Sequence, residues 1–146
     1  MKLGPDIPNC YYRVSVRALI TNEACQVLMV RENGRDWDLP GGGLDWGEDP
    51  IDGLHRELTE EIGCSGEIEP LPILVTPWAN VEERQHLLWL VYRVTVDESQ
   101  ITTTEHVSEY CFLNLMEHMQ KDADNQTEWI SPTNFKRDIQ KILSQL

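Results

Sequence analysis

The chain has 146 residues, of which 40% are hydrophobic and 25% charged, a length that suits one globular domain and excludes two of ordinary size. Twelve Lys and Arg against 25 Asp and Glu leave a formal net charge of −13, which predicts repulsion from nucleic-acid polymers and anionic membranes. The longest apolar run, residues 87–92, is far shorter than the roughly 20 residues of a membrane-spanning helix. Since no apolar stretch follows Met1 either, we expect a cytoplasmic single domain over residues 1–146, with its core at about 10–143.

The first third of the chain is typical of paired strands followed by a glycine-rich loop. Residues 12–20 alternate polar and apolar side chains, the period of a half-buried strand, and residues 26–31 predict the return strand. A short extended piece at 37–40 leads into three consecutive glycines, Gly41, Gly42 and Gly43, which we expect to form a loop.

A helix is predicted directly after the glycines. Asp49 is a good N-cap residue, Pro50 suits the first helical position, and Gly63 is placed to end the helix near Ile62.

The second half predicts more strands and a last helix. Residues 68–76 read as a strand interrupted by Pro70 and Pro72, and residues 85–96 and 110–113 as two further strands. Residues 115–128 have no clear period, whereas Ser131 and Pro132 predict the start of a C-terminal helix. This order of elements predicts an α/β (α+β) fold, a mixed sheet with helices on its faces.

The central helix has two different faces. Ile51, Leu54, Leu58 and Ile62 fall within a stripe roughly 80° wide, which predicts packing onto the sheet. The neighbouring face carries Gly53, Glu57, Glu60 and Glu61. Like charges three or four residues apart weaken an isolated helix by a few tenths of a kcal/mol, so a purely structural sequence has little reason to place them together.

Two interpretations of this acidic face compete. One is an ordinary solvated surface. The other is a binding site, and the adjacent glycines favour it, because consecutive glycines are expected where the chain takes a special conformation or approaches something closely. Clustered carboxylates with a backbone carbonyl suit Mg²⁺ or Mn²⁺, which bridge to phosphates. The four cysteines form no C-x-x-C pair, which argues against zinc, and no G-K-[ST] follows the glycines, which excludes a P-loop.

Residues 42–64 carry a recognisable motif. Gly42, Glu48, Arg56-Glu57-Leu58, Glu60-Glu61, Ile62 and Gly63 resemble the signature of the Nudix hydrolases at every fixed position but the last, where Cys64 replaces a large aliphatic residue. The resemblance implies an α/β/α sandwich around a mixed β-sheet. It also implies Mg²⁺-dependent hydrolysis, with Mn²⁺ as a substitute, of a nucleoside diphosphate linked to another moiety.

The resemblance also assigns roles to these residues. Glu57, Glu60 and Glu61 would bind metal together with the Gly41 carbonyl, and Glu48 and Arg56 would pair to orient them. Glu57 is a candidate for activating the water, although in this family the base also comes from outside the motif. A later acidic ligand is expected, with Glu109 the first choice and Glu105 the second.

The substrate stays open at this point. Arg31, Arg17 and Arg35 are candidate phosphate contacts beside the glycines Gly41, Gly42 and Gly43, and the candidates for stacking a base are Tyr11, Tyr12, Trp46 and Trp78. Nucleoside triphosphates, nucleotide sugars and dinucleoside polyphosphates all remain candidates. The alternative to an enzyme is a Nudix-fold module that senses a nucleotide without catalysis; homodimers, common in the family, are allowed for either.

Overall fold

The structure is a computed structural model that describes residues 12–35, 37–80, 85–117, 129–130 and 135–145. Its strands are β1 (Arg13–Leu19), β2 (Val27–Arg31), β3 (Gly41–Gly43), β4 (Glu67–Ile68), β5 (Leu74–Asn80), β6 (Gln85–Thr95), β7 (Glu109–Leu113) and β8 (Trp129–Ile130). Among the described residues, the α-helices that have defined bounds are α1 (Pro50–Ile62) and α3 (Phe135–Leu143), and a 3₁₀ turn lies at Glu98–Gln100.

The main sheet is mixed, as the sequence predicts. Its strand order is β3-β1-β6-β5-β8, and β4 pairs with the far end of β6. The two central strands, β1 and β6, run parallel, whereas β3 and β5 pair antiparallel with them. A separate antiparallel pair joins β2 to β7. The three-residue strand β3 therefore lies at one edge of the main sheet.

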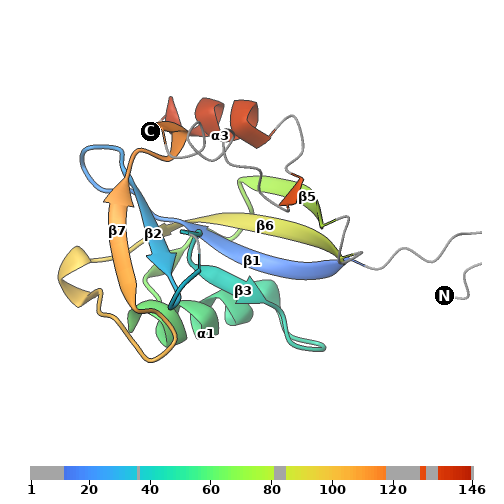
Figure 1. The fold of residues 1–146 in the computed structure, drawn as a ribbon, viewed down its shortest axis with the longest axis horizontal. Coiled ribbons are helices and arrows are strands. Elements are labelled where there is room, and N and C mark those ends of the chain that lie inside the picture. Colours follow the sequence, from blue (N-terminus) through green and yellow to red (C-terminus); the bar gives the residue numbers. More distant parts are fainter. Residues whose placement is uncertain (1–11, 36, 81–84, 118–128, 131–134, 146) are drawn as a thin grey trace, which may run out of the picture.

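Helices cover both faces of this sheet, α1 on one side and α3 on the other (Figure 1). Because side chains alternate along a strand, each central strand supplies both cores. In β1, Val16 and Ala18 pack with Leu54 and Leu58 of α1, while Leu19 packs in the second core, which contains Ile139 of α3. This layering confirms the expected sandwich.

The ends of α1 form as predicted. The Asp49 carboxylate accepts the N–H of Ile51 at 2.9 Å and that of Asp52 at 3.4 Å, which satisfies two N–H groups that the first turn leaves without partners. Gly63 takes the left-handed conformation, with φ of 74°, and its N–H donates to the Thr59 carbonyl. The whole span from Pro50 to Ile62 is helical, so the acidic side chains have fixed directions.

Two expectations need correction, and one strand was not expected. The glycines form strand β3, held by pairing with β1, where we expected a loop. The strand expected at 68–76 is two strands, because the prolines at 70 and 72 break the pairing and β5 starts only at Leu74. Strand β5 continues through Pro77 to Asn80. The described part of β8 pairs with β5 at Ala79 and Asn80, beyond this proline. The sequence did not predict β8, and the expected cap at 131–132 lies outside the described residues.

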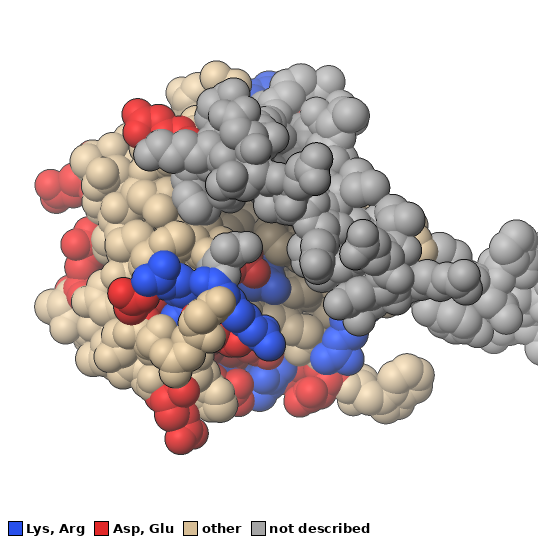
Figure 2. Space-filling model, in the orientation of Figure 1, with Lys and Arg blue, Asp and Glu red and all other residues tan. Residues whose placement is uncertain are grey.

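Within the described residues no helix is long and apolar enough to cross a membrane. The face of the molecule seen in Figure 1 carries Lys and Arg side chains across its middle, with Asp and Glu side chains beside them (Figure 2). Charges of both signs thus meet near β3.

Candidate active site

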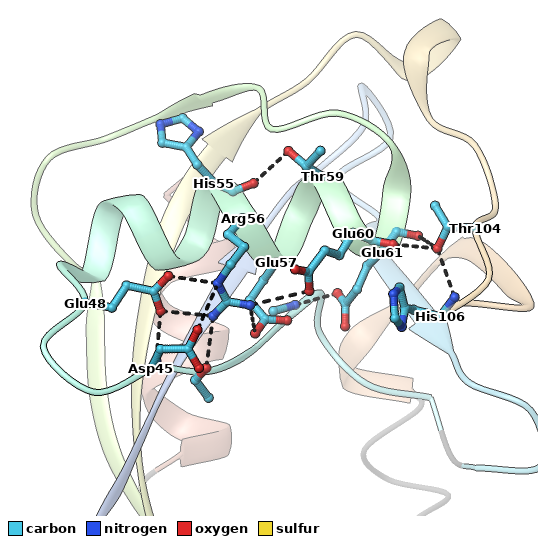
Figure 3. A network of polar contacts seen from close by, with 12 residues as sticks. Asp45, Glu48, His55, Arg56, Glu57, Thr59, Glu60, Glu61, Thr104 and His106 are labelled. Carbon is cyan, nitrogen blue, oxygen red and sulfur yellow. Dashed lines mark hydrogen bonds and ion pairs between the residues drawn. The ribbon is translucent and has the colours of Figure 1, made fainter.

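The three helix carboxylates lie in different environments although they share one face of α1 (Figure 3). The Glu60 side chain is exposed, that of Glu57 is largely buried, and Glu61 is buried with only 9% of its surface accessible. The apolar stripe predicted for this helix is confirmed, since Leu54, Leu58 and Ile62 are fully buried. Packing of that stripe therefore brings the adjacent acidic face against β3.

Arg56 is the centre of a charge network at the N-terminal half of the helix. Its Nε donates to Glu48 Oε1 at 2.8 Å and its Nη2 to Glu48 Oε2 at 3.0 Å, a two-point contact. Its Nη1 lies 2.9 Å from Glu57 Oε1 and 3.4 Å from Glu60 Oε2. The hydrogen bonds from Arg56, together with the Asp45 N–H, lower the pKa of Glu48 to about 2. Glu48 and Arg56 are thus paired, as the resemblance implies.

Glu61 is compensated far less. Its Oε2 accepts the N–H of Gly41 at 2.7 Å, which ties the helix to the start of β3. Burial nevertheless raises the pKa of Glu61 to about 8, and the neighbouring Glu57 acts in the same direction, against the Gly41 N–H and the positive charge of Arg17. A carboxylate in this position is stabilised by any cation that reaches it.

Two glycines of β3 lie too close to neighbouring atoms of β1 or α1 to carry a side chain. A Cβ on Gly42 would lie 2.5 Å from a Glu57 carboxylate oxygen, and one on Gly41 would lie 2.0 Å from the Val16 carbonyl oxygen. Gly53 on α1 is equally restricted, since its Cβ would meet the Leu44 side chain at 2.3 Å. The special role inferred for these glycines is therefore close approach within a strand.

A loop after β6 closes over the C-terminal end of α1. The Thr102 N–H donates to the Ile62 carbonyl at 3.0 Å, and Thr104 Oγ1 donates to the Glu60 carbonyl at 2.6 Å. These bonds satisfy carbonyl groups that a helix end leaves without partners. They also fix the backbone from which Glu60 and Glu61 project.

The expected later ligands are not gathered with the helix carboxylates. Glu109, at the start of β7, forms an ion pair with Arg31, whose Nε lies 2.6 Å from Glu109 Oε2. The Glu105 side chain is exposed and lies 3.6 Å from the His106 ring. Nowhere in the described part of the chain do three His, Cys, Asp or Glu side chains form a cluster that could hold a metal ion.

The other candidates are dispersed. Arg17 is largely buried, donates to Asp38 at 3.0 Å and to the Leu39 carbonyl at 2.9 Å, and so anchors the chain that enters β3. Arg35 is exposed and pairs with Glu32. Of the aromatic candidates, Trp46 is fully exposed, and Tyr12 is exposed beside His86. Trp78 packs against Trp89 with the two rings tilted by 41°, and Tyr11 lies outside the described residues.

Sequence reasoning did not single out Arg13. In the structure its guanidinium lies against Gly43, on the opposite face of β3 from Glu57. The pairing of β1 with β3, which places Ser15 opposite Gly43, produces this contact. The alternation of residues 12–20 placed Arg13 and Arg17 on one face of the strand. Which glycine Arg13 contacts depends on the register between β1 and β3, which the sequence alone did not show.

Comparisons with known proteins bear on the family of this chain. The family model described as NUDIX domain matches residues 11–132. An RNA pyrophosphohydrolase of Ruthia magnifica is 51% identical over 57 residues, 38% of this chain and 32% of its own length. One from Pseudomonas fluorescens SBW25 is 36% identical over 78 residues, 53% of this chain and 49% of its own. The chain thus matches only a third to a half of the length of these relatives.

Solved structures support the fold. The MutT protein of Methanosarcina mazei Go1 superposes with a TM-score of 0.67 over 92% of this chain and 94% of its own, at 24% identity. An identity this low establishes the shared fold alone. The family match, however, covers most of the chain and includes the whole motif at residues 42–64. The chain therefore belongs to the Nudix (NUDIX domain) family.

Proposed function

We propose that this protein hydrolyses a phosphoric anhydride bond in a nucleoside diphosphate linked to another moiety, with Mg²⁺ as cofactor and Mn²⁺ as a substitute. The observation that supports this most directly is the face of α1, where Glu57, Glu60 and Glu61 project together and Glu61 is held at the glycine strand. The two curated relatives described above are both named RNA pyrophosphohydrolases, which agrees with this chemistry.

The chemical type of the donors suits a hard divalent cation, and the side chains would have to converge to bind one, since the described residues form no such cluster in this structure. The donors would be the carboxylates of Glu57, Glu60 and Glu61 and the carbonyl of Gly41, all oxygen donors of the kind that Mg²⁺ prefers. The buried Glu61, with its pKa raised to about 8, gains most from a cation. Glu109 remains a proposed further ligand, which would have to leave Arg31, and Glu105 is the second choice. When bound, the metal would neutralise phosphate charge and lower the pKa of a water.

Different residues of the chain have different proposed roles in the reaction. Glu48 holds Arg56 through two hydrogen bonds, and Arg56 in turn contacts Glu57, so this pair fixes the direction of the Glu57 carboxylate. Glu57 is our candidate for accepting the proton of the attacking water. The backbone of β3, including Gly41, Gly42 and Gly43, would contact the substrate, because glycines leave it accessible. The reacting phosphorus is attacked in line, and a phosphate-bearing fragment leaves.

A small nucleotide is the proposed substrate, since a net charge of −13 opposes the approach of a long polyanion. The 5′ end of an RNA is the second candidate, because the matched relatives are RNA pyrophosphohydrolases. A non-catalytic nucleotide sensor is disfavoured by the complete carboxylate set. A homodimer and a cytoplasmic location stay predictions.

The test is a hydrolysis panel with product identification by chromatography. Nucleoside triphosphates, nucleotide sugars, ADP-ribose, dinucleoside polyphosphates and a 5′-triphosphorylated RNA oligonucleotide are compared with Mg²⁺, with Mn²⁺ and with a chelator. We expect metal-dependent cleavage of one small nucleotide at its diphosphate. Preference for the RNA would transfer the proposal to the second candidate, and absence of turnover in folded, Mg²⁺-binding protein would favour the sensor.

A further inference from the structure

The arginines that the sequence offered as phosphate contacts are already engaged. Arg17 bonds Asp38 and the Leu39 carbonyl, and its guanidinium also lies 4.8 Å from the Trp89 ring centre. Arg31 pairs with Glu109, and Arg35 pairs with Glu32. Each of these cations would have to give up an acidic partner before it could bind an anionic substrate.

Arg13 differs from them. Its side chain is exposed, and neither an ion pair nor a hydrogen bond joins that side chain to any residue that the structure describes. What its guanidinium does contact is the glycine strand: a Cβ on Gly43 would lie 2.5 Å from Arg13 Nη2 and 2.7 Å from Nε. A side chain at position 43 would therefore displace the guanidinium from this place.

The position of β3 places this cation close to the candidate active site. Successive residues of a strand face opposite sides, so Gly42 faces the Glu57 carboxylate and Gly43 faces Arg13. With only hydrogen atoms on its α-carbons, β3 separates the two groups by little more than the thickness of its backbone. The strand is also the sheet edge, where Glu61 accepts the Gly41 N–H and Arg56 donates to the Gly43 carbonyl, so a ligand that lies beside the Gly43 N–H can reach both faces.

The outer side of β3 adds a suitable donor. The Leu44 N–H bonds the Val14 carbonyl and the Ala18 N–H bonds the Pro40 carbonyl, which fixes the alternation of the antiparallel ladder. By that alternation the N–H of Gly43 points away from β1. This N–H lies between the Arg13 guanidinium on one face of β3 and the Glu57 carboxylate on the other. An anion bound at this edge could accept a hydrogen bond from it.

We propose that Arg13 binds a phosphate group of the substrate across the edge of β3 from the helix carboxylates. This rests on the function proposed above, and it adds a residue for which neither the motif nor the comparisons assign a role. A guanidinium offers paired N–H donors that match phosphate oxygens, and Arg13 has no ion pair with a described residue that would have to break first. In a chain with net charge −13, such a local cation is also what an anionic substrate needs.

The experiment measures binding without turnover. Methylenediphosphonate, in which carbon replaces the bridging oxygen, is titrated calorimetrically into the protein with Mg²⁺ present. We expect Arg13→Gln to weaken binding by about 10- to 100-fold, and Arg13→Lys to fall between it and the unchanged protein. The control, Lys141→Gln, removes one exposed positive charge from α3 and should bind as tightly as the unchanged protein.

A second readout needs no loss of Arg13. In the ¹H–¹⁵N spectrum of the unchanged protein, the Arg13 Nε–Hε signal, assigned by its absence in Arg13→Lys, should shift on saturation with the diphosphonate. On the preferred substrate of the panel, Arg13→Gln should raise KM with a smaller change in kcat.

The outcomes separate the two proposals. Equal binding by Arg13→Gln and Lys141→Gln, with an unmoved Nε signal, would overturn the role of Arg13 and leave the hydrolase intact. Failure of the unchanged protein to bind the diphosphonate with Mg²⁺ would count against both. If Arg13→Gln does not fold, as circular dichroism would show, Arg13→Lys and the Nε signal decide.

Discussion

The two ends of α1 present the same residue type in opposite electrostatic situations. Before the helix, Glu48 accepts two hydrogen bonds from Arg56, and its pKa is lowered to about 2. In the last turn, Glu61 is buried, its pKa is raised to about 8, and a backbone N–H is its only hydrogen-bond donor within the described residues. Glu48 thus already has its cation, whereas Glu61 has none of comparable strength. This difference supports the roles that we propose, with Glu48 orienting Arg56 and Glu61 binding a cation.

The largest effect should come from Glu57, which contacts Arg56 on one side and faces Gly42 on the other. As the proposed base and metal ligand, Glu57→Gln should lower turnover by about 100- to 10,000-fold while leaving the fold intact. Steady-state kinetics on the preferred substrate measure turnover, and circular dichroism measures whether the fold is intact. Near-normal turnover would remove Glu57 from the centre of the mechanism.

Glu61→Gln and Glu48→Gln compare the two ends directly. We expect Glu48→Gln to cost about 10- to 100-fold in turnover, as loss of an orienting contact, and Glu61→Gln to cost at least about tenfold more. Isothermal titration with Mg²⁺ should show a larger loss of metal affinity for Glu61→Gln. Equal losses of turnover and of Mg²⁺ affinity in both variants would mean that the two carboxylates have the same role.

Gly42→Ala tests the close approach between β3 and the helix. The added Cβ must displace the Glu57 carboxylate, so we expect turnover to fall by about tenfold and the free energy of unfolding by about 1 to 3 kcal/mol. Denaturant unfolding and kinetics measure these. The control is Gly34→Ala, because nothing lies within 4 Å of a Cβ at this position. The positive φ of Gly34 means that this variant should be less stable, but its turnover should be unchanged.

The smallest effect is a pH dependence of stability in a chelator. Glu61 binds its proton more tightly in the folded chain, so its contribution is present below about pH 4.5 and is lost as pH rises toward 8. Over that window Tm should fall by several degrees more in the unchanged protein than in Glu61→Gln. Glu48 acts in the opposite direction, losing its contribution as pH falls from about 4.5 toward 2. Identical Tm profiles from pH 5 to 8 would contradict the difference.

Local signals made most of this architecture predictable. Asp49, Pro50 and Gly63 define α1 within a few residues of sequence, and period-two alternation defines β1. The spacing of Glu57, Glu60 and Glu61 likewise placed them on one helix face. What remained hidden depends on pairing between distant segments: glycine has little strand propensity, so β3 forms only because β1 holds it. The contacts of Arg13 and Glu109 are set by the same long-range registers.

The outer edge of β3 has a further consequence for how copies of this protein behave toward one another. A free strand edge invites pairing with another chain, and an edge of bare glycines has no side chains to prevent it. Here Glu61 occupies the Gly41 N–H, and Arg56 Nη2 lies 3.3 Å from the Gly43 carbonyl oxygen. The same two charged residues that belong to the candidate site therefore protect the edge, and their joint removal should promote aggregation as well as inactivity.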